Sequence, residues 1–367
     1  MSAAEVTAPD DAARYVAAVQ ALGVPALLRN LETSISLHRW GTCDVPLTRN
    51  DGDTANTFVC SPHVGLIRYP REELAHFPDA RLAHLLRLVL AAAGLVAAPA
   101  QLNRIVTINN WLLTTNPPRA RDPHLADAQT AELVARYPHH MLALRSLTRR
   151  QQAPLMQALE NRGWLMMPAR QVYFMEDAAQ ALRMRRDCLR DEKAFRQTPL
   201  RFDVLKTMTA EDAARIAALY RQLYLEKHST LNPDYTAAFV QMAHDTGLLA
   251  FHVFRDSAGL IQCFAALSQT DDSLTAPLMG YDTAAPQALN FYRLAFHAIT
   301  RHAAAQGLLL NMSSGAAGFK RNRGAVPEME FTALYVRHLP ALRRLSTTLL
   351  QRAAMAIAVP LLQKYGL

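Results

Sequence analysis

A short polar segment, residues 226–232, gathers groups that can transfer protons or form hydrogen bonds: Glu226, Lys227, His228, Ser229 and Asn232. Histidine accepts a proton near neutral pH without a large pKa shift, so His228 is the first candidate for a general base. Glu226 is the rival base, and the other three can bind a substrate. The structural alternative is that Glu226 and Lys227 are solvated charges at a helix end, where His228 caps the carbonyls.

A second candidate region, residues 307–336, combines an apolar run, a loop of small residues and a cationic cluster. The apolar run, residues 308–310, follows a helix and predicts a strand that is covered on both faces. Ser313 and Ser314 begin the loop, whose small side chains let a ligand approach the backbone. Phosphate, carboxylate or a tRNA backbone would suit the cluster that follows, although a solvated loop is the alternative: Lys320, Arg321 and Arg323.

The elements around these residues indicate a strand, a helix, a strand, a cationic loop and a final strand. Residues 279–283 read as a strand end, with Tyr281 and Asp282 facing the expected cleft. Pro286 suits the first turn of a helix that carries Tyr292 and runs to residue 306, and Gly307 suits the position after its end. Tyr281 is either a hydrogen-bond donor or a packing aromatic, and Asp282 is either a binding group or the cap of that helix.

This order resembles the core of the GNAT acetyltransferase superfamily, and in particular its BioF-type and Fem-type (FemAB-like) branch. The resemblance lies mainly in residues 200–340 and is carried by Gly280-Tyr281-Asp282, the helix begun by Pro286, and Gly318-Phe319-Lys320-Arg321 with Gly324. It implies acyl transfer with no covalent intermediate, so Cys263 is expected in the core. It also implies that the polar segment lies beside the acceptor pocket and that Tyr281 protonates a leaving thiolate.

One departure from the family concerns the acyl donor. Ordinary GNAT enzymes hold the CoA pyrophosphate on a glycine-rich turn at a helix N-terminus. Residues 282–287 contain no glycine here, and Pro286 has no N–H to donate. A donor other than CoA, such as an aminoacyl-tRNA or a carrier-protein thioester, therefore stays open.

The N-terminal half is interpreted as a degenerate copy of the same architecture. No repeat is visible at residue level, so this interpretation depends on the order of the elements and on the tandem GNAT-like architecture that the Fem-type resemblance implies. The fold class is α/β with a mixed sheet. We expect a GNAT-like domain over residues 1–180, an acyltransferase domain over 181–340 and a helical segment over 341–367. Expected N-terminal strands include residues 34–38, 57–60, 64–69 and 103–108, and residues 80–93 are expected to form an apolar helix.

The composition fits a cytoplasmic enzyme. The chain has 367 residues, a net charge of +8 and four scattered cysteines. No cysteine or histidine spacing suggests a metal site, so we expect buried, reduced thiols and no metal. No run of eighteen apolar residues and no signal peptide is recognised, so no transmembrane segment is expected. Residues 341–367 are either a closing helix broken at Pro360 or a membrane-surface helix, and the closing helix is preferred.

These observations lead to one preferred function and two alternatives. The preferred function is transfer of an acyl group from an activated thioester, acyl-CoA or another donor, to an amine of a small metabolite or amino-acid-like acceptor. No tightly bound cofactor is expected. The positive charge is compatible with tRNA or an acyl carrier protein as a partner. The alternatives are a Fem-type transferase that uses aminoacyl-tRNA and a GNAT fold that binds a partner without catalysis. The sequence does not indicate an oligomeric state.

Overall fold

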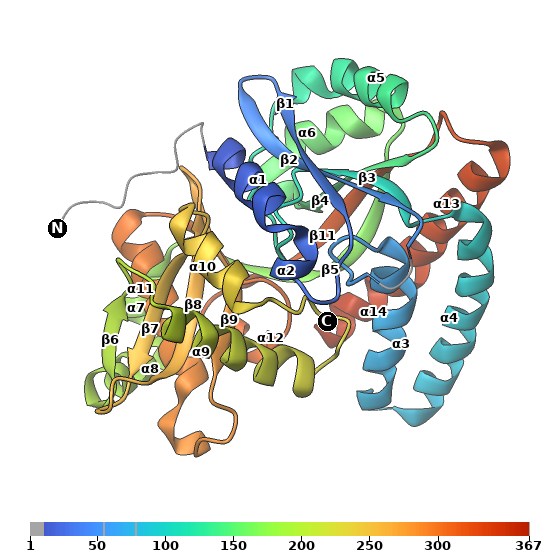
Figure 1. Ribbon diagram of the computed structural model, residues 1–367. Helices are drawn as coiled ribbons and strands as arrows, with labels where there is room; N and C mark the ends of the chain where they lie inside the picture. The colour runs from blue at the N-terminus through green and yellow to red at the C-terminus, as the bar shows by residue number, and fades with distance from the viewer. Residues whose placement is uncertain (1–10, 54–55, 78, 367) are drawn as a thin grey trace.

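A single mixed sheet runs through the molecule, in a computed structural model that describes residues 11–53, 56–77 and 79–366 (Figure 1). Its eleven strands are ordered β1-β2-β3-β4-β11-β5-β10-β9-β8-β7-β6. The strands are β1 (Ser34–Trp40), β2 (Cys43–Asp51), β3 (Arg104–Ile108), β4 (Met141–Leu147), β5 (Leu165–Met175), β6 (Arg201–Val204), β7 (Ala250–Arg255), β8 (Ile261–Gln269), β9 (Ser273–Tyr281), β10 (Leu309–Asn311) and β11 (Val326–Tyr335).

Helices cover the sheet and connect its strands. The α-helices are α1 (Asp11–Leu22), α2 (Val24–Leu27), α3 (Tyr69–Glu73), α4 (Ala80–Ala100), α5 (Ala126–Arg136), α6 (Arg149–Arg162), α7 (Ala178–Met184), α8 (Arg186–Gln197), α9 (Ala210–Arg221), α10 (Ala237–Asp245), α11 (Phe291–Gln306), α12 (Ala317–Asn322), α13 (Ala341–Ala353) and α14 (Val359–Tyr365). The 3₁₀ and π turns are η1 (Val64–Arg68), η2 (Leu74–His76), η3 (Pro123–Leu125), η4 (Gln222–Glu226), η5 (Gln287–Leu289) and η6 (Ala354–Ala358).

Two parallel strand pairs, one in each half of the chain, organise the sheet. β3 pairs with β4 and β9 pairs with β10, and all other pairings are antiparallel among the strands described. The helical connection between the partners is α5 in the first pair and α11 in the second. β11 comes from the C-terminal half but lies between β4 and β5, so each half completes the sheet of the other. The mixed α/β fold class is thereby confirmed, and the domain boundaries remain a prediction.

The largest apolar core also joins the two halves. It packs N-terminal aromatic residues such as Tyr15 and Trp111 with C-terminal residues such as Tyr220, Phe239 and Phe264, all of them buried. Burial of aromatic area on this scale stabilises folded domains strongly. The expectation for the cysteines holds for Cys60, Cys188 and Cys263, which are buried and free, whereas Cys43 is exposed.

Several predicted elements differ from the structure. Residues 57–60 form a turn, and residues 64–69 are helical instead of extended, which corrects both predicted strands. Ser61 explains the helix, because its Oγ accepts a hydrogen bond from Val64 N at 3.1 Å and Pro62 suits a first turn. β2 was not expected because its sequence includes Pro46 and Asp44, which are uncommon in strands. Pairing with both β1 and β3 stabilises it nonetheless.

The C-terminal half follows the predicted order, with two corrections near the expected site. The helix that we expected from Pro286 begins only at Phe291, because Asn290 has a left-handed φ of 55° that interrupts the helical path. Residues 317–322 form α12 and are not an open cationic loop. Gly307 ends α11 as predicted, with φ at 65°.

The expectation of no transmembrane segment remains a prediction. Two described helical stretches, Ala80–Ala100 and Ala341–Tyr365, are long and apolar enough to cross a membrane by length and composition alone. The sequence predicted both as helices, over residues 80–93 and 341–367, and a few arginines interrupt each apolar run. The closing helix does continue to Tyr365, with a π turn at residues 354–358 just before Pro360.

Candidate active site

The fork between β9 and β10 is the centre of the candidate site. The two strands pair only from Ser273 to Thr275 of β9, after which β9 continues alone beside β8 as far as Tyr281. Helix α9 lies directly on β9 at Gly280, where a Cβ atom would come within 2.8 Å of the backbone of Leu219 and Tyr220. Glycine is therefore required at this position by close packing, and Tyr281 is held at the end of the strand.

The turn that follows β10 is tied together by a buried lysine. Lys320 of α12 is 1% exposed, and its Nζ donates to the carbonyl oxygens of Ser313 and Ser314 at 3.0 and 2.6 Å. Burial, together with the positive charge of Arg170, lowers the Lys320 pKa to about 7. Lys320 therefore loses its proton more readily than an exposed lysine does. Ser313 and Ser314 are half-buried.

The N-terminal half contributes Arg170 from β5 to the same place. Its guanidinium binds the buried carboxylate of Glu330 at 2.9 and 3.2 Å and donates to the Thr114 carbonyl oxygen at 2.9 Å. Arg170 Nη1 also lies 3.5 Å from Ser314 Oγ. Thr114 Oγ1 donates to the carbonyl oxygen of Pro277 at 2.9 Å, on the part of β9 beyond the fork. The fork is therefore bridged by side chains from both halves of the chain.

A group of half-buried tyrosines surrounds the end of β9. The rings of Tyr281 and Tyr292 are 6.4 Å apart, and Tyr292 contacts Phe319 of α12 at 4.8 Å. Burial, followed by the neighbouring hydroxyls of Tyr69 and Tyr281, raises the pKa of Tyr224 to about 12. Burial likewise raises the pKa of Tyr292, with Tyr224 and Tyr281 as neighbours. These hydroxyls stay protonated at neutral pH and can serve as hydrogen-bond donors.

The polar segment lies against this tyrosine group but on the outside of it. Glu226, Lys227 and His228 are exposed. The Lys227 Nζ is 6.0 Å from the Tyr281 ring centroid, and the His228 ring is 6.2 Å from that of Tyr224. Glu226 pairs with Arg221 at 3.7 Å. The structure thus brings the predicted base candidates to the rim of the site, while Lys320 lies in its interior.

Four residues predicted to bind substrate form structural contacts instead. Ser229 is buried and bonded to Glu72, and the buried Asn232 donates to the Tyr224 and Ser229 carbonyl oxygens at 3.0 Å. Asp282 pairs with Arg215 and accepts from Ala284 N, so it caps a turn and not α11. Arg323 is 3% exposed and binds both carboxylate oxygens of Asp191 at 2.6 and 2.9 Å. Their side chains are engaged in the fold, whereas Arg321 is exposed.

A family model matches part of the chain that contains this site. The model is described as the acetyltransferase (GNAT) domain, and it matches residues 182–321. Residues 182–321 are a GNAT domain. No curated protein matches the chain. Among solved structures, L-PGS from Bacillus licheniformis is 14% identical, with a TM-score of 0.45 over 67% of this chain and 83% of that one. FemX is 9% identical, with a TM-score of 0.47 over 61% and 80%. These likenesses are too weak to carry a functional argument.

The match confirms the predicted resemblance to the GNAT superfamily and, with it, acyl transfer as the general reaction. The match ends at Arg321, so it includes β9, β10 and Lys320. It does not include Arg170 or Tyr69, which precede the matched residues in the chain. Arg170 stands in a strand that is otherwise mostly apolar, and this contrast was the one available signal. The sequence gives no sign that Glu330 and Thr114 belong to the site, because only the tertiary structure brings them to the GNAT domain.

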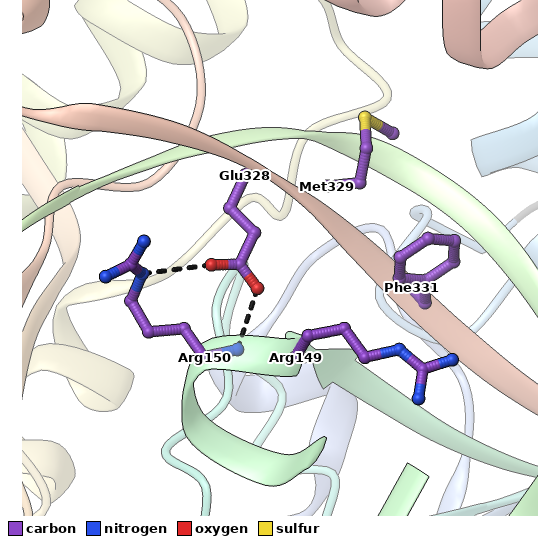
Figure 2. A pocket seen from close by; sticks show the side chains of 5 residues that line it. All are labelled: Arg149, Arg150, Glu328, Met329 and Phe331. Atoms are coloured by element: carbon purple, nitrogen blue, oxygen red, sulfur yellow. Dashed lines mark hydrogen bonds and ion pairs between the residues drawn. The ribbon is translucent and has the colours of Figure 1, made fainter. Parts of the chain in front are cut away.

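A surface hollow of about 480 Å³ is lined by five residues, none of which was predicted to act. Figure 2 shows Arg149, Arg150, Glu328, Met329 and Phe331 around it. Arg150 donates to the Glu328 carboxylate through its backbone N at 2.8 Å and its Nε at 3.0 Å, and Arg149 pairs with Glu160. Both guanidinium groups are already neutralised by carboxylates. Among the residues that line this hollow, no cation is left unpaired for an anionic ligand.

Proposed function

We propose that the chain transfers an acyl group from an activated donor to an amine, at the fork between β9 and β10 of its GNAT domain. The observation that carries the proposal is Lys320, a buried lysine whose Nζ lies against two carbonyl oxygens and whose pKa is lowered to about 7. Buried lysines with strongly lowered pKa values are frequent at catalytic sites.

The two carbonyl oxygens suit the neutral form of Lys320. A neutral amine has two N–H donors and one lone pair, and Ser313 and Ser314 accept from the two donors. The remaining lone pair can take a proton from the acceptor ammonium, which must become neutral before its nitrogen attacks. His228 and Glu226, exposed at the rim, are the rival bases. In this proposal Lys320 accepts the proton, and the residues at the rim bind the acceptor.

The rest of the reaction needs donors for developing negative charge. The acceptor nitrogen forms a bond to the donor carbonyl carbon, and the carbonyl oxygen becomes an oxyanion that hydrogen-bond donors stabilise. The candidate donors are the hydroxyls of the half-buried Tyr281, Ser313 and Ser314 and the guanidinium of Arg170, which lies 3.5 Å from Ser314 Oγ. The C–S or C–O bond to the leaving group then breaks. The nitrogen of the adduct then carries one proton too many, and the Tyr281 hydroxyl can relay that proton to the departing thiolate or alkoxide.

Aminoacyl-tRNA is the alternative donor, and one observation favours it over CoA. The segment before α11 has no glycine-rich turn, and it consists of a 3₁₀ turn and Asn290 in a left-handed conformation. This backbone lacks the succession of free N–H groups on which ordinary GNAT enzymes hold pyrophosphate. Exposed arginines on α7 and α8 offer contacts to a nucleic-acid backbone: Arg183, Arg186 and Arg190.

A donor screen tests the proposal. Purified protein is incubated with a pool of amines and, in turn, with acyl-CoA thioesters, an acyl carrier protein thioester or charged tRNA, and products are identified by mass spectrometry. Each reaction is repeated with Lys320→Met. Product from a thioester supports the preferred donor, and ribonuclease-sensitive product supports tRNA. No product from any donor, together with tight capture of a protein partner, would overturn the proposal in favour of a binding protein without catalysis.

A further inference from the structure

Two long helical stretches leave most of their apolar surface uncovered. In each stretch the most apolar segment is eighteen residues long. Only 11% of this segment is buried in Ala80–Ala100 and 17% in Ala341–Tyr365. Leu95 is 79% exposed, Leu342 is 62% exposed and Leu88 is 57% exposed. Soluble domains rarely leave so many large apolar side chains in water on adjoining helices. We call these two stretches the helix pair.

The helix pair is antiparallel and joined at both ends (Figure 1). At one end Arg343 donates to the carbonyl oxygens of Ala100 and Gln101, which terminate α4. At the other end the rings of Phe77 and Tyr365 are 4.7 Å apart. The stretches have 21 and 25 residues, so each is roughly 31 to 37 Å long at about 1.5 Å per residue. The two stretches therefore adjoin each other where α4 meets α13 and at this ring contact.

The exposed leucines lie on a defined face of each helix. Leu85, Leu88 and Leu95 follow the spacing of one helical face, and Leu342, Leu345 and Leu349 do the same on α13. Small or apolar residues on the other side, including Ala97, Ala100 and Leu350, pack onto the core of β3, β4 and β11. The inner face is therefore fixed to the sheet, and the outer face is apolar and unpartnered within the described chain.

The charge of the helix pair has one sign. Neither stretch contains Asp or Glu. Its exposed basic residues flank the leucine stripes: Arg81, Arg87, Arg344, Arg352 and Lys364. The nearest acid in sequence is Asp79, which caps α4 by accepting from Arg81 N and Leu82 N. An apolar stripe bordered by cations complements a surface that is apolar inside and anionic at its edge.

We infer that the helix pair binds the surface of an anionic lipid bilayer, with its leucine stripes among the acyl chains and its basic residues among the headgroups. A second copy of the chain would bring the same cations face to face, whereas anionic headgroups neutralise them. A spanning arrangement would require the inner face to leave the sheet, and the packing of Ala97 and Leu350 opposes this. The pair therefore lies in the plane of the interface.

The far end of the helix pair adjoins the GNAT site. A Cβ atom on Gly366, directly after α14, would meet Ala317 of α12 at 2.6 Å and the hydroxyl of Tyr173 at 3.0 Å. α12 is the helix that carries Lys320. Binding to a bilayer would thus place the acyl-transfer site close to the headgroup layer.

Vesicle flotation tests this inference with the full chain. The protein is mixed with vesicles of phosphatidylcholine alone or of phosphatidylcholine and phosphatidylglycerol in equal parts. We expect it to float with the anionic vesicles and to be released partly by salt, which screens the headgroup contacts. The paired substitution Leu88→Gln with Leu345→Gln should lower the partition coefficient at least tenfold. Leu189→Gln with Leu260→Gln, two similarly exposed leucines elsewhere, is the matched control and should leave it unchanged.

Three outcomes would overturn the inference. The first is no flotation of the unsubstituted protein. The second is flotation that the Leu88 and Leu345 substitutions leave intact, which would move lipid binding to another surface. The third is a dimer in sedimentation velocity that these substitutions dissociate, without any binding to vesicles. That result would assign the stripes to a second copy. The double variant Arg344→Gln with Arg352→Gln tests the role of the positive charge and should reduce the salt-sensitive part of vesicle binding. The control variant Arg183→Gln with Arg186→Gln, on α7 and α8, should not reduce it.

Discussion

The sheet has two places where a pair of parallel strands ends and the strands separate: β3 with β4, and β9 with β10. We call them the N-terminal and the C-terminal fork, and they differ in how far their polar groups are buried. At the N-terminal fork, β3 leads into Asn109, Asn110 and Trp111, all of them buried. Asn110 donates to Thr48 Oγ1 at 2.9 Å and to the carbonyl oxygen of Val59 at 3.1 Å. Arg145 of β4 donates to that same carbonyl oxygen at 3.1 Å. The polar groups at this fork form hydrogen bonds with one another.

At the C-terminal fork the corresponding polar groups remain half-buried. Tyr281, Ser313 and Ser314 retain solvent contact, and the Nζ of the buried Lys320 donates to two backbone carbonyl oxygens. One parallel fork has therefore become a packed core, and the other keeps groups that can meet a ligand. The comparison teaches that strand topology alone does not create an active site, because the side chains that fill the fork decide whether it is available.

The largest expected effect concerns the charged pair at the open fork. Arg170→Gln should lower the free energy of unfolding by about 3 kcal/mol or more, because it leaves the Glu330 carboxylate buried without a counter-ion. Arg145→Gln at the closed fork should cost only about 1 to 2 kcal/mol, since its partners are neutral oxygens. Urea unfolding measures both. Adding Glu330→Gln to Arg170→Gln should restore stability. Equal losses of unfolding free energy in Arg170→Gln and Arg145→Gln would contradict the expected difference between the forks.

Lys320→Met should reduce turnover about a hundredfold or more, the usual size of a lost acid–base group. Arg145→Met, normalised to folded protein by circular dichroism, should stay within about threefold of the unsubstituted enzyme, because the closed fork takes no part in the reaction. Thr48→Val provides a milder second control at that fork. The assay is the transfer reaction found by the donor screen. Retained turnover in Lys320→Met would leave Lys320 with a purely structural role.

The lowered pKa of Lys320 also predicts a pH dependence of stability. The folded-state pKa is about 7 and the unfolded value about 10.4, so the unfolded chain binds more protons between these two pH values. The contribution of Lys320 to stability therefore rises with pH from about 7 to about 10, by at most about 1.4 kcal/mol per pH unit. Unfolding curves of the unsubstituted protein and Lys320→Met across this range isolate the effect. Parallel curves would show that the lysine is not desolvated in the folded state.

The smallest expected effect is at the rim. His228→Ala should change the free energy of unfolding by no more than about 0.5 kcal/mol, as usual for an exposed position. If Lys320 is the base, turnover should fall less than tenfold, and the rising limb of the pH–rate profile near neutral pH should persist. A hundredfold loss together with loss of that limb would move the base from the interior to His228. Collapse in Glu226→Gln alone would move it to the carboxylate.

Local patterns were enough to find the open fork but not to describe its contents. The apolar run after Gly307, the proline near residue 286 and the glycine at residue 280 predicted the strand, helix and strand order, since each depends on nearby residues. The sequence could not reveal the partners of Arg323 and Asn232, because these lie in distant or folded-back segments. Asp191, for example, is 132 residues from Arg323. Charge in a sequence does not reveal whether a carboxylate will neutralise it.

The sequence by itself determined the α/β class, the order of elements in the C-terminal half and the GNAT resemblance. These follow from periodicity, turn residues and short motifs, which act over a few residues. The tertiary structure alone decided that β11 enters the N-terminal part of the sheet, that Arg170 and Glu330 meet beside Ser314, and that Lys320 is buried with a lowered pKa. It also decided which apolar helices stay uncovered. Burial and charge pairing depend on long-range packing, and packing is a property of the whole fold.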